Sequence, residues 1–361
     1  MDYLQHYNRL PSAFGAPAVA AIYKQTPDDF QVIEQGGFTP AKHGDHLALR
    51  IRKTNQSTTD IVACLCRSFA VGDVDIGYSG QKDKRAITEQ WFTVHLPGLN
   101  VTPENKITSP TLPPDAEIIA QHKHDRKLRH GTHTGNHFVV WLREVSGSVD
   151  ALRDHIECVR QQGFPNYFGE QRFGIGHRNM IKAETLFTQF NQKVRGRKQR
   201  ISRTQRSMYL SAARSFLFNE ILATRIRAGN WLTPQPNEKL MLHGSRSFFH
   251  YRNEPDVPAR LQRHDIHTTA PLWGRDDANT DNCAEPIITD WEAKSLRDYP
   301  LLTEGLERAG MIASRRALRC VPKNLVCEQS GSNSIRLSFE LPPGSFATAL
   351  LKELTDAREG R

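Results

Sequence analysis

The amino-acid sequence predicts an α+β protein in which both ends of the chain build one sheet-based domain and the middle forms an inserted domain. Two observations support this prediction. Alternating apolar residues, typical of strands, are concentrated in the first third of the chain and return only after about residue 315. Between them lies a long helical pattern, followed by irregular stretches that contain proline and tryptophan. We expect residues 1–163 and 313–361 to form the sheet-based domain and residues 164–312 the insertion.

The first elements are predicted by the spacing of apolar residues. Residues 46–52 alternate apolar and polar side chains, as in a half-buried strand. Residues 57–70 repeat apolar side chains at helical spacing, begin with a serine and an aspartate three positions apart, and are expected to stop at Gly72. Residues 74–78 and 90–96 are again typical of strands, and the polar segment between them is expected to be a loop.

The later elements are predicted in the same way. Residues 138–143 and 335–341 alternate like strands. Residues 148–162 and 206–228 are typical of helices, and each is followed by a glycine that is expected to end it. A Pro-Pro-Gly-Ser turn then leads into a C-terminal helix that begins near Phe346.

The composition excludes several classes of protein. Of the 361 residues 38% are hydrophobic, which is enough to build cores and excludes a fully disordered chain. No apolar run reaches the roughly 20 residues of a membrane-spanning helix, so no membrane association is expected. The six cysteines form no C-x-x-C pair. We therefore expect no metal site and no disulfide framework, and a reducing, cytoplasmic location.

Positive charge is concentrated in three runs. The 48 Lys and Arg outnumber the 39 Asp and Glu, which gives a formal net charge of +9. Residues 193–206 carry seven Lys or Arg and no acid. The two other runs comprise Lys123, Arg126, Lys127 and Arg129, and Arg315, Arg316 and Arg319. One basic run is usually a solvated face, but three in different places favour a large anionic ligand. Residues 275–292, in contrast, are acidic.

One carboxylate stands among three cations in the loop before strand 90–96. Asp83 follows Lys82 and precedes Lys84 and Arg85. Nearby positive charge keeps a carboxylate ionised, and an ionised, fixed carboxylate suits a nucleophile or a stabiliser of an oxocarbenium-like centre. The alternative is an aspartate that is salt-bridged in a surface turn, and composition alone favours that alternative.

Five motifs resemble those of one known family. Residues 80–90 resemble G-x-K-D-x-x-A-x-T-x-Q, the signature of the tRNA pseudouridine synthase D family. The other four motifs follow the family's order and are K-x-x-P-x-D-F at 24–30, G-N-x-F at 135–138, N-Y-F-G-x-Q-R-F-G at 166–174 and G-S-F-A-T at 344–348. Together they span nearly the whole chain. The acidic stretch 275–292 resembles none of the family's motifs.

The resemblance implies a fold and a reaction. It implies a pseudouridine synthase catalytic core, a mixed and largely antiparallel sheet with flanking helices, that carries a family-specific α/β insertion. The implied substrate is uridine 13 in the D-arm of tRNA. The reaction breaks the C1′–N1 bond, turns the uracil and forms a C1′–C5 bond. Because it involves no redox change and loses no group, no cofactor and no metal are expected. We expect a monomer whose partner is tRNA.

The resemblance also implies roles for individual residues. Asp83 is the implied catalytic carboxylate, which attacks C1′ or assists formation of a glycal, and Lys24 is its implied partner. The implied pocket residues are Phe30, Asn136, Phe138 and Phe346. The expected RNA contacts are Lys82, Lys84, Arg85, Tyr167, Arg172, Lys123, Arg126, Lys127 and Arg129. Without the motifs, each phenylalanine fits a core better than a pocket, Lys24 fits a strand edge, and Asn136 fits a turn.

Two other functions are compatible with part of this pattern. A non-catalytic RNA-binding module would explain the charge alone. An N-glycosidase would cleave the same bond and stop there. Isomerisation leaves the mass of the RNA unchanged, a glycosidase removes uracil, and a binding module does neither.

Overall fold

The computed structural model describes residues 2–98, 110–191, 201–276 and 286–360, and these form two compact units. The sheet unit comprises Ala18–Ile156, Pro322–Gly344 and Thr355–Arg361. The helical unit comprises Met1–Pro17, Glu157–Val321 and Ser345–Leu354. The expected α+β class is confirmed, as is a sheet that draws strands from both parts of the chain. The expected domain boundaries at 163/164 and 312/313 stay a prediction.

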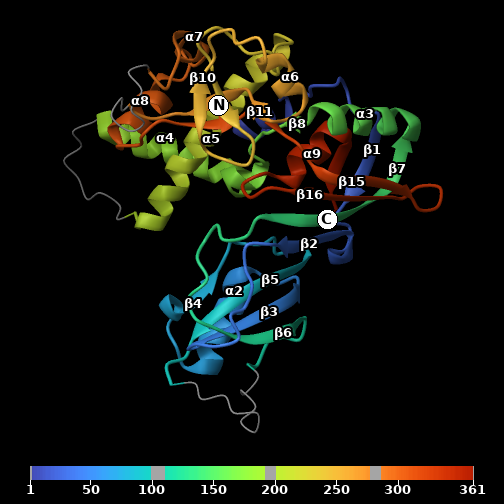
Figure 1. The fold of residues 1–361 in the computed structure, drawn as a ribbon, viewed down its shortest axis with the longest axis vertical. Coiled ribbons are helices and arrows are strands. Elements are labelled where there is room, and N and C mark those ends of the chain that lie inside the picture. Colours follow the sequence, from blue (N-terminus) through green and yellow to red (C-terminus); the bar gives the residue numbers. More distant parts are fainter. Residues whose placement is uncertain (1, 99–109, 192–200, 277–285, 361) are drawn as a thin grey trace. The chain divides into compact units, whose positions relative to one another are not determined.

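The sheet unit contains one ten-stranded sheet (Figure 1). Its main path runs β15–β16–β7–β2–β5–β3–β6, with β1, β17 and β4 attached at its side. Most neighbouring pairs are antiparallel, while β2–β5 and β1–β17 are parallel. The strands are β1 Val19–Tyr23, β2 Phe30–Gln35, β3 His46–Thr54, β4 Ile76–Tyr78, β5 Ile87–His95, β6 Ala116–His124, β7 Gly135–Gly147, β15 Lys323–Gln329, β16 Ile335–Leu341 and β17 Asp356–Glu359.

Helix α2 (Thr58–Phe69) covers β3, β4 and β5 in the sheet unit (Figure 1). Its start is capped as predicted, because Ser57 Oγ accepts from Asp60 N and the Asp60 carboxylate accepts from Ser57 N. The last helical residue, Phe69, lies three positions before the expected Gly72. Ala70 itself takes the left-handed conformation, with φ 53°, that closes the last turn.

The apolar core beneath α2 is built from alternate positions of its strands. Leu47 lies opposite Val94, and Leu49 lies opposite Phe92, in the β3–β5 register. All four side chains are fully buried. Burial at every second residue is the pattern from which residues 46–52 were predicted to be a strand.

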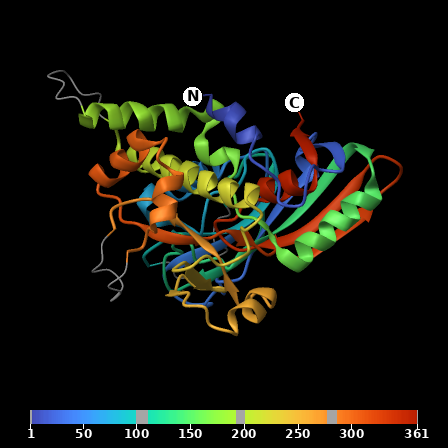
Figure 2. The same cartoon turned by 90° about the horizontal axis from the view of Figure 1, so that it is seen from above.

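The helical unit is organised around α5 (Arg203–Arg227). Helix α4 (Arg178–Asn191) lies along α5, and α8 (Pro300–Arg308) packs against both (Figures 1 and 2). Its short strands pair as β10–β9–β11, β12–β13 and β14–β8. The remaining strands and helices of the protein are α1 Tyr3–Asn8, α3 Val149–Gln162, α6 Val257–Gln262, α7 Asp290–Ser295, α9 Ala347–Leu354, β8 Phe164–Pro165, β9 Lys239–Leu242, β10 Phe248–His250, β11 Ile266–His267, β12 Thr269–Leu272, β13 Ser314–Ala317 and β14 Arg319–Cys320.

Helices α3, α5 and α9 confirm the three later helix predictions. Gly163 and Gly229 follow α3 and α5 in left-handed conformations, with φ 78° and 67°. In the described part of the chain, no helix is long and apolar enough to cross a membrane.

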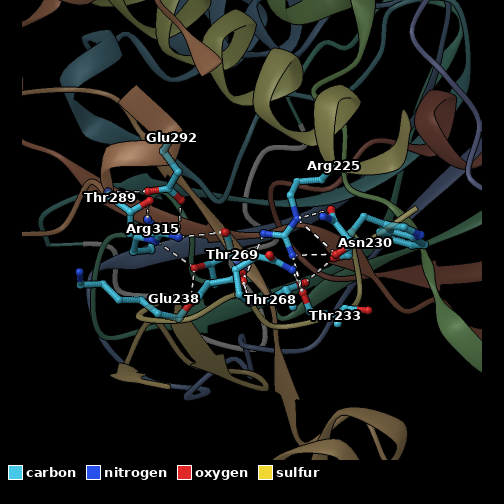
Figure 3. Close-up of polar contacts among 12 residues, drawn as sticks. Arg225, Asn230, Thr233, Glu238, Thr268, Thr269, Thr289, Glu292 and Arg315 are labelled. Atoms are coloured by element: carbon cyan, nitrogen blue, oxygen red, sulfur yellow. Dashed lines mark hydrogen bonds and ion pairs between the residues drawn. The ribbon is translucent and has the colours of Figure 1, made fainter. Parts of the chain in front are cut away.

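Two buried ion pairs hold the helical unit together (Figure 3). Arg315 Nη2 lies 2.8 Å from Glu292 Oε1, and both side chains are fully buried. Arg225 Nη1 donates to Glu238 Oε2 at 3.2 Å. Burial raises the pKa of Glu238. Breaking such a pair typically costs about 3–5 kcal/mol, since it leaves an uncompensated buried charge.

The basic run at 315–319 therefore does not form the solvent-facing patch that the sequence predicted. Arg315 is committed to Glu292, and Arg319 is buried with its Nε donating to His267 Nδ1 at 2.8 Å. Glu292 belongs to the acidic stretch 275–292, whose end is thus structural. Residues 277–285 of that stretch and residues 193–200 of the basic run 193–206 lie outside the described residues.

Candidate active site

The Asp83 loop joins β4 to β5, and its first half is held by side chains of neighbouring elements. Lys82 N donates to Thr58 Oγ1 at 2.9 Å, at the start of α2. Gln90 Nε2 donates to Gly80 O at 3.0 Å, from β5. Thr58 Oγ1 donates to Gln90 Oε1, which closes the set. The loop is therefore fixed to two elements of the sheet unit rather than exposed as a free turn.

A fully buried lysine supports the same loop from β3. Lys53 Nζ donates to Gln56 O at 2.5 Å and to Asp83 O at 3.3 Å. Burial lowers the pKa of Lys53 to about 8, and the nearby charge of Asp83 opposes that shift. The hydrogen bonds that the Lys53 ammonium donates to backbone carbonyls offset the cost of burying its charge. Lys53 thus contributes to the position of the Asp83 backbone.

Lys24 meets the carboxylate of Asp83. Lys24 Nζ lies 3.8 Å from Asp83 Oδ1. The ammonium also lies 4.2 Å from the centroid of the Phe30 ring, a cation–π contact. Lys24 follows β1 with φ 55°, in the left-handed region that a residue with a side chain rarely adopts. Such a conformation persists only where the surroundings enforce it, and it is concentrated at functional sites.

Lys82 points away from Asp83 and into the sheet unit. Its side chain is 4% exposed, and its Nζ lies 3.0 Å from Glu34 Oε2. The same ammonium donates to Asn136 Oδ1 at 2.6 Å. Because an ammonium can only donate, it fixes the Asn136 amide with the oxygen toward Lys82. The RNA contact expected for Lys82 does not fit this placement, since the ammonium is buried and already paired.

The expected pocket aromatics of the sheet unit form a buried column of rings. The centroids of Phe30 and Phe138 lie 6.1 Å apart, and Phe138 stacks on Phe339 at 5.3 Å. Phe30 is 1% exposed and Phe138 is 6% exposed. In the structure both rings therefore belong to the core, and they form the apolar side of the Lys24 environment. Their stacking on a base stays a prediction.

The two cations that follow Asp83 differ from each other. Lys84 is exposed. Arg85 is half-buried, and its Nη1 donates to Gly360 O. Gly360 N in turn donates to Tyr23 O at 2.8 Å, next to Lys24. Arg85 thus links the loop of the carboxylate to the strand end that carries its partner.

Three further expected residues belong to the helical unit. Tyr167 is 2% exposed, and its hydroxyl donates to Pro11 O at 3.1 Å, so it offers no face for the expected RNA contact. Arg172 is half-buried, with its guanidinium 5.7 Å from the Phe346 ring. Phe346 packs edge-on against Phe168 at 5.8 Å. Whether Phe346 lines the pocket of Asp83 stays a prediction.

The basic residues at the end of β6 and in the segment after it lie in the sheet unit. Lys123 is half-buried on β6, and Arg126, Lys127 and Arg129 are exposed in the segment that follows it. They lie on the protein surface, as expected for contacts with a polyanion.

Sequence reasoning missed Glu34 and Lys53, although a signal for each was present. Both continue the buried face of an alternating strand, two positions beyond Val32 and Ile51 respectively. A charged residue at a position that the alternation assigns to the interior is a candidate for a buried pair.

The arrangement combines a partly exposed carboxylate, a buried cation and an oriented amide. The Asp83 side chain is 24% exposed, whereas that of Lys24 is 8% exposed. An ionised carboxylate of this kind can act as a nucleophile or as a general base. Among the described residues, no group of three or more His, Cys, Asp or Glu side chains is arranged to hold a metal ion.

Comparisons with known proteins agree with the five motifs. The family model described as tRNA pseudouridine synthase D (TruD) matches residues 13–183 and 177–354. The tRNA pseudouridine synthase D of Xanthomonas axonopodis pv. citri is 38% identical over 359 residues, covering 97% of this chain and 95% of that protein. The protein of the same name from Methylococcus capsulatus is 36% identical, with the same coverage.

The fold is also similar to a solved structure. A crystal structure from Methanosarcina mazei, described as tRNA pseudouridine synthase D (TruD), aligns with a TM-score of 0.67 and covers 97% of both chains. The sequence identity in that alignment is 16%, so the alignment supports a shared fold and nothing further.

Proposed function

The chain belongs to the tRNA pseudouridine synthase D family and isomerises uridine in tRNA to pseudouridine, and we propose that Asp83 is the carboxylate at which this happens. The observation that carries this assignment is the contact between Lys24 and Asp83, at 3.8 Å. A lysine held in a rare backbone conformation places a buried cation beside a carboxylate that remains partly exposed.

The reaction rearranges bonds without loss of any group. The C1′–N1 bond breaks, uracil turns, and the C1′–C5 bond forms, while the proton on C5 leaves and N1 gains one. Asp83 attacks C1′ directly or assists formation of a glycal, and both routes need an ionised carboxylate. Lys24 places its positive charge 3.8 Å from the carboxylate on either route. No cofactor and no metal are required by this chemistry.

Asn136 is proposed to recognise the uracil. Lys82 holds its Oδ1, so Nδ2 is left as the donor for a ligand. The edge of uracil carries carbonyl oxygens that accept from such a donor. Lys82 and Glu34 are then positioning residues, which act through Asn136 and not on the base itself.

The remaining parts of the proposal come from the resemblance. We propose uridine 13 in the D-arm of tRNA as the target, flipped out of its stack to reach the carboxylate. Phe30, Phe138 and Phe346 are proposed to surround the flipped base. Lys84, Arg85 and Arg172 are proposed to contact the RNA backbone, together with the basic residues that follow β6. We expect the protein to act as a monomer in the cytoplasm.

Carbodiimide mapping of an unmodified tRNA transcript treated with the purified protein tests the proposal. The expected result is a pseudouridine stop at position 13 and an unchanged RNA mass. A transcript with cytidine at position 13 is the matched control and should give no stop. Loss of uracil from the RNA would instead identify a glycosidase, and an unmodified transcript that still binds would identify a binding module.

A further inference from the structure

A cavity of about 230 Å³ lies in the sheet unit between the segments 37–39 and 124–132. That volume far exceeds the roughly 10–15 Å³ that a single water needs. Its lining combines one aromatic ring, Phe38, with the cations of Arg126, Lys127 and Arg129. Neither Phe38 nor the cavity is part of the site around Asp83 described above.

Glycines allow the two walls of this cavity to approach each other. Gly37 has φ 69°, and a Cβ there would lie 1.8 Å from Thr132 O. Gly44 has φ 97°, and a Cβ there would lie 2.5 Å from His124 O. Ala41 N also donates to His124 Nδ1 at 3.1 Å. The cavity is therefore bounded by backbone that only glycine permits, and its shape is formed before any ligand arrives.

The charge in the cavity suits an anion. Arg126 and Arg129 are exposed and make no ion pair with a described residue, while Lys127 Nζ donates to Val74 O. The adjacent acid, Asp125, has its Oδ1 3.4 Å from His124 Nε2. Guanidinium groups bind phosphate oxygens with two parallel hydrogen bonds, so two arginines without acidic partners favour a phosphate.

The aromatic ring in the cavity suits a base. Phe38 is half-buried, with its centroid 4.6 Å from that of His124 and 5.2 Å from that of Trp91. Burial lowers the pKa of His124. Unpaired RNA bases stack on aromatic side chains that are supported in this way.

The cavity is tied to the catalytic loop. Gly131 N, in the segment that carries the arginines, donates to Ser79 O at 2.7 Å. Ser79 precedes Asp83 by four residues, a span of at most about 14 Å of extended chain. At about 3.4 Å per stacked nucleotide, that span corresponds to at most roughly four nucleotides of one strand.

We propose that this cavity binds an unpaired nucleotide of the substrate tRNA other than the reacting uridine. Its base stacks on Phe38, and its phosphate is bound by Arg126 and Arg129. The inference rests on the proposed function for the identity of the RNA. It adds a second nucleotide site, which anchors the tRNA a few nucleotides away from the uridine at Asp83.

Filter binding of a tRNA transcript to the full-length protein across salt concentrations tests the phosphate contact. The double variant Arg126→Gln/Arg129→Gln should lower the magnitude of the slope of log affinity against log salt by about 0.7–0.9, since both arginines bind the same phosphate and each neutralised phosphate contributes about that much. The control Arg153→Gln/Arg336→Gln loses the same charge from residues that pair with Asp150 and Glu328 and do not line the cavity. Equal slopes for the two double variants would overturn the phosphate contact.

Abasic substitution of the unpaired nucleotides, one at a time, tests the base contact. At one position it should weaken binding to the wild-type protein on the order of tenfold to a hundredfold, and it should have little effect on Phe38→Leu. Absence of such coupling at every position would overturn the site. These binding results are independent of pseudouridine formation by the wild-type protein, whose absence would instead refute the proposed function.

Discussion

Lys24 Nζ lies 3.8 Å from Asp83 Oδ1, and this pair joins the end of β1 to the loop between β4 and β5. The cation is buried, whereas the carboxylate is partly exposed. A substrate can thus reach the anion while the opposing charge stays behind it, against the ring of Phe30.

Lys24→Met should slow pseudouridine formation more than it weakens tRNA binding. Two unit charges about 4 Å apart interact by roughly 4 kcal/mol at an effective dielectric constant of 20, and half of that energy is about 30-fold in rate. Single-turnover rates and filter binding measure the two effects. Lys84→Met removes the same charge from the exposed neighbour of Asp83, and it should leave the single-turnover rate at saturating enzyme nearly unchanged even where it weakens tRNA binding. Equal rate losses in both variants would refute a specific pair.

Lys82→Met should destabilise the protein by about 3–5 kcal/mol, because it leaves Glu34 buried without its cation. The double variant Lys82→Met/Glu34→Leu should recover most of that stability in urea unfolding. Its rate should nevertheless stay low, on the order of tenfold below wild type, because nothing then orients the Asn136 amide. A double variant with the wild-type rate would show that Lys82 does not act through Asn136.

Phe138→Ala should lower the free energy of unfolding by about 3–5 kcal/mol, since it opens a cavity beside Phe339. Phe138→Leu keeps most of the buried volume and separates packing from base stacking. If the ring stacks on the flipped uracil, Phe138→Leu should lose one to two decades of rate at nearly normal stability. A normal rate for Phe138→Leu would show that the ring packs in the core and does not stack on the flipped uracil.

Acid should destabilise the helical unit partly through His267. Burial, with the charge of Arg319, lowers the pKa of His267 to about 3, whereas an unfolded histidine titrates near 6.5. The unfolded chain therefore binds one more proton between these values. Stability from this group is present above about pH 6.5 and falls by up to about 1.4 kcal/mol per unit as the pH drops.

Urea unfolding at pH 7, 6 and 5 measures that dependence. His267→Asn keeps an acceptor for Arg319 and should make the free energy of unfolding depend less on pH. The control His122→Asn, at an exposed position, should leave the pH dependence unchanged. The same pH dependence in His267→Asn and in the wild type would contradict the assignment.

The regular elements were predictable because local spacing determines them. Residues 335–341 alternate, and β16 spans the same residues, while Ser57 and Asp60 form the capping box that starts α2. The short strand pairs of the helical unit could not be predicted from the sequence. Their strands, such as β8 and β14, have only two to four residues, which is too few to show an alternating pattern.

The charged residues were the harder part of the prediction. Sequence proximity placed Lys82 beside Asp83, yet its side chain reaches Glu34 and Asn136 on two neighbouring strands. The sequence groups Arg315 with Arg316 and Arg319 in a basic run, but its partner in the structure is Glu292, 23 positions away. Pairing over such separations depends on the tertiary fold, and although a charge on the buried face of a strand signals that a partner is needed, the local sequence does not identify the partner.

Pseudouridine formation by Asp83→Asn, measured at saturating enzyme in a single turnover beside tRNA binding, is the most direct test of the account. The substitution keeps the shape of the side chain and removes its charge. We expect no detectable pseudouridine, with tRNA affinity and urea unfolding close to those of the wild type. Formation of pseudouridine by the pure variant at even about a tenth of the wild-type rate would contradict the assignment of Asp83 as the essential carboxylate.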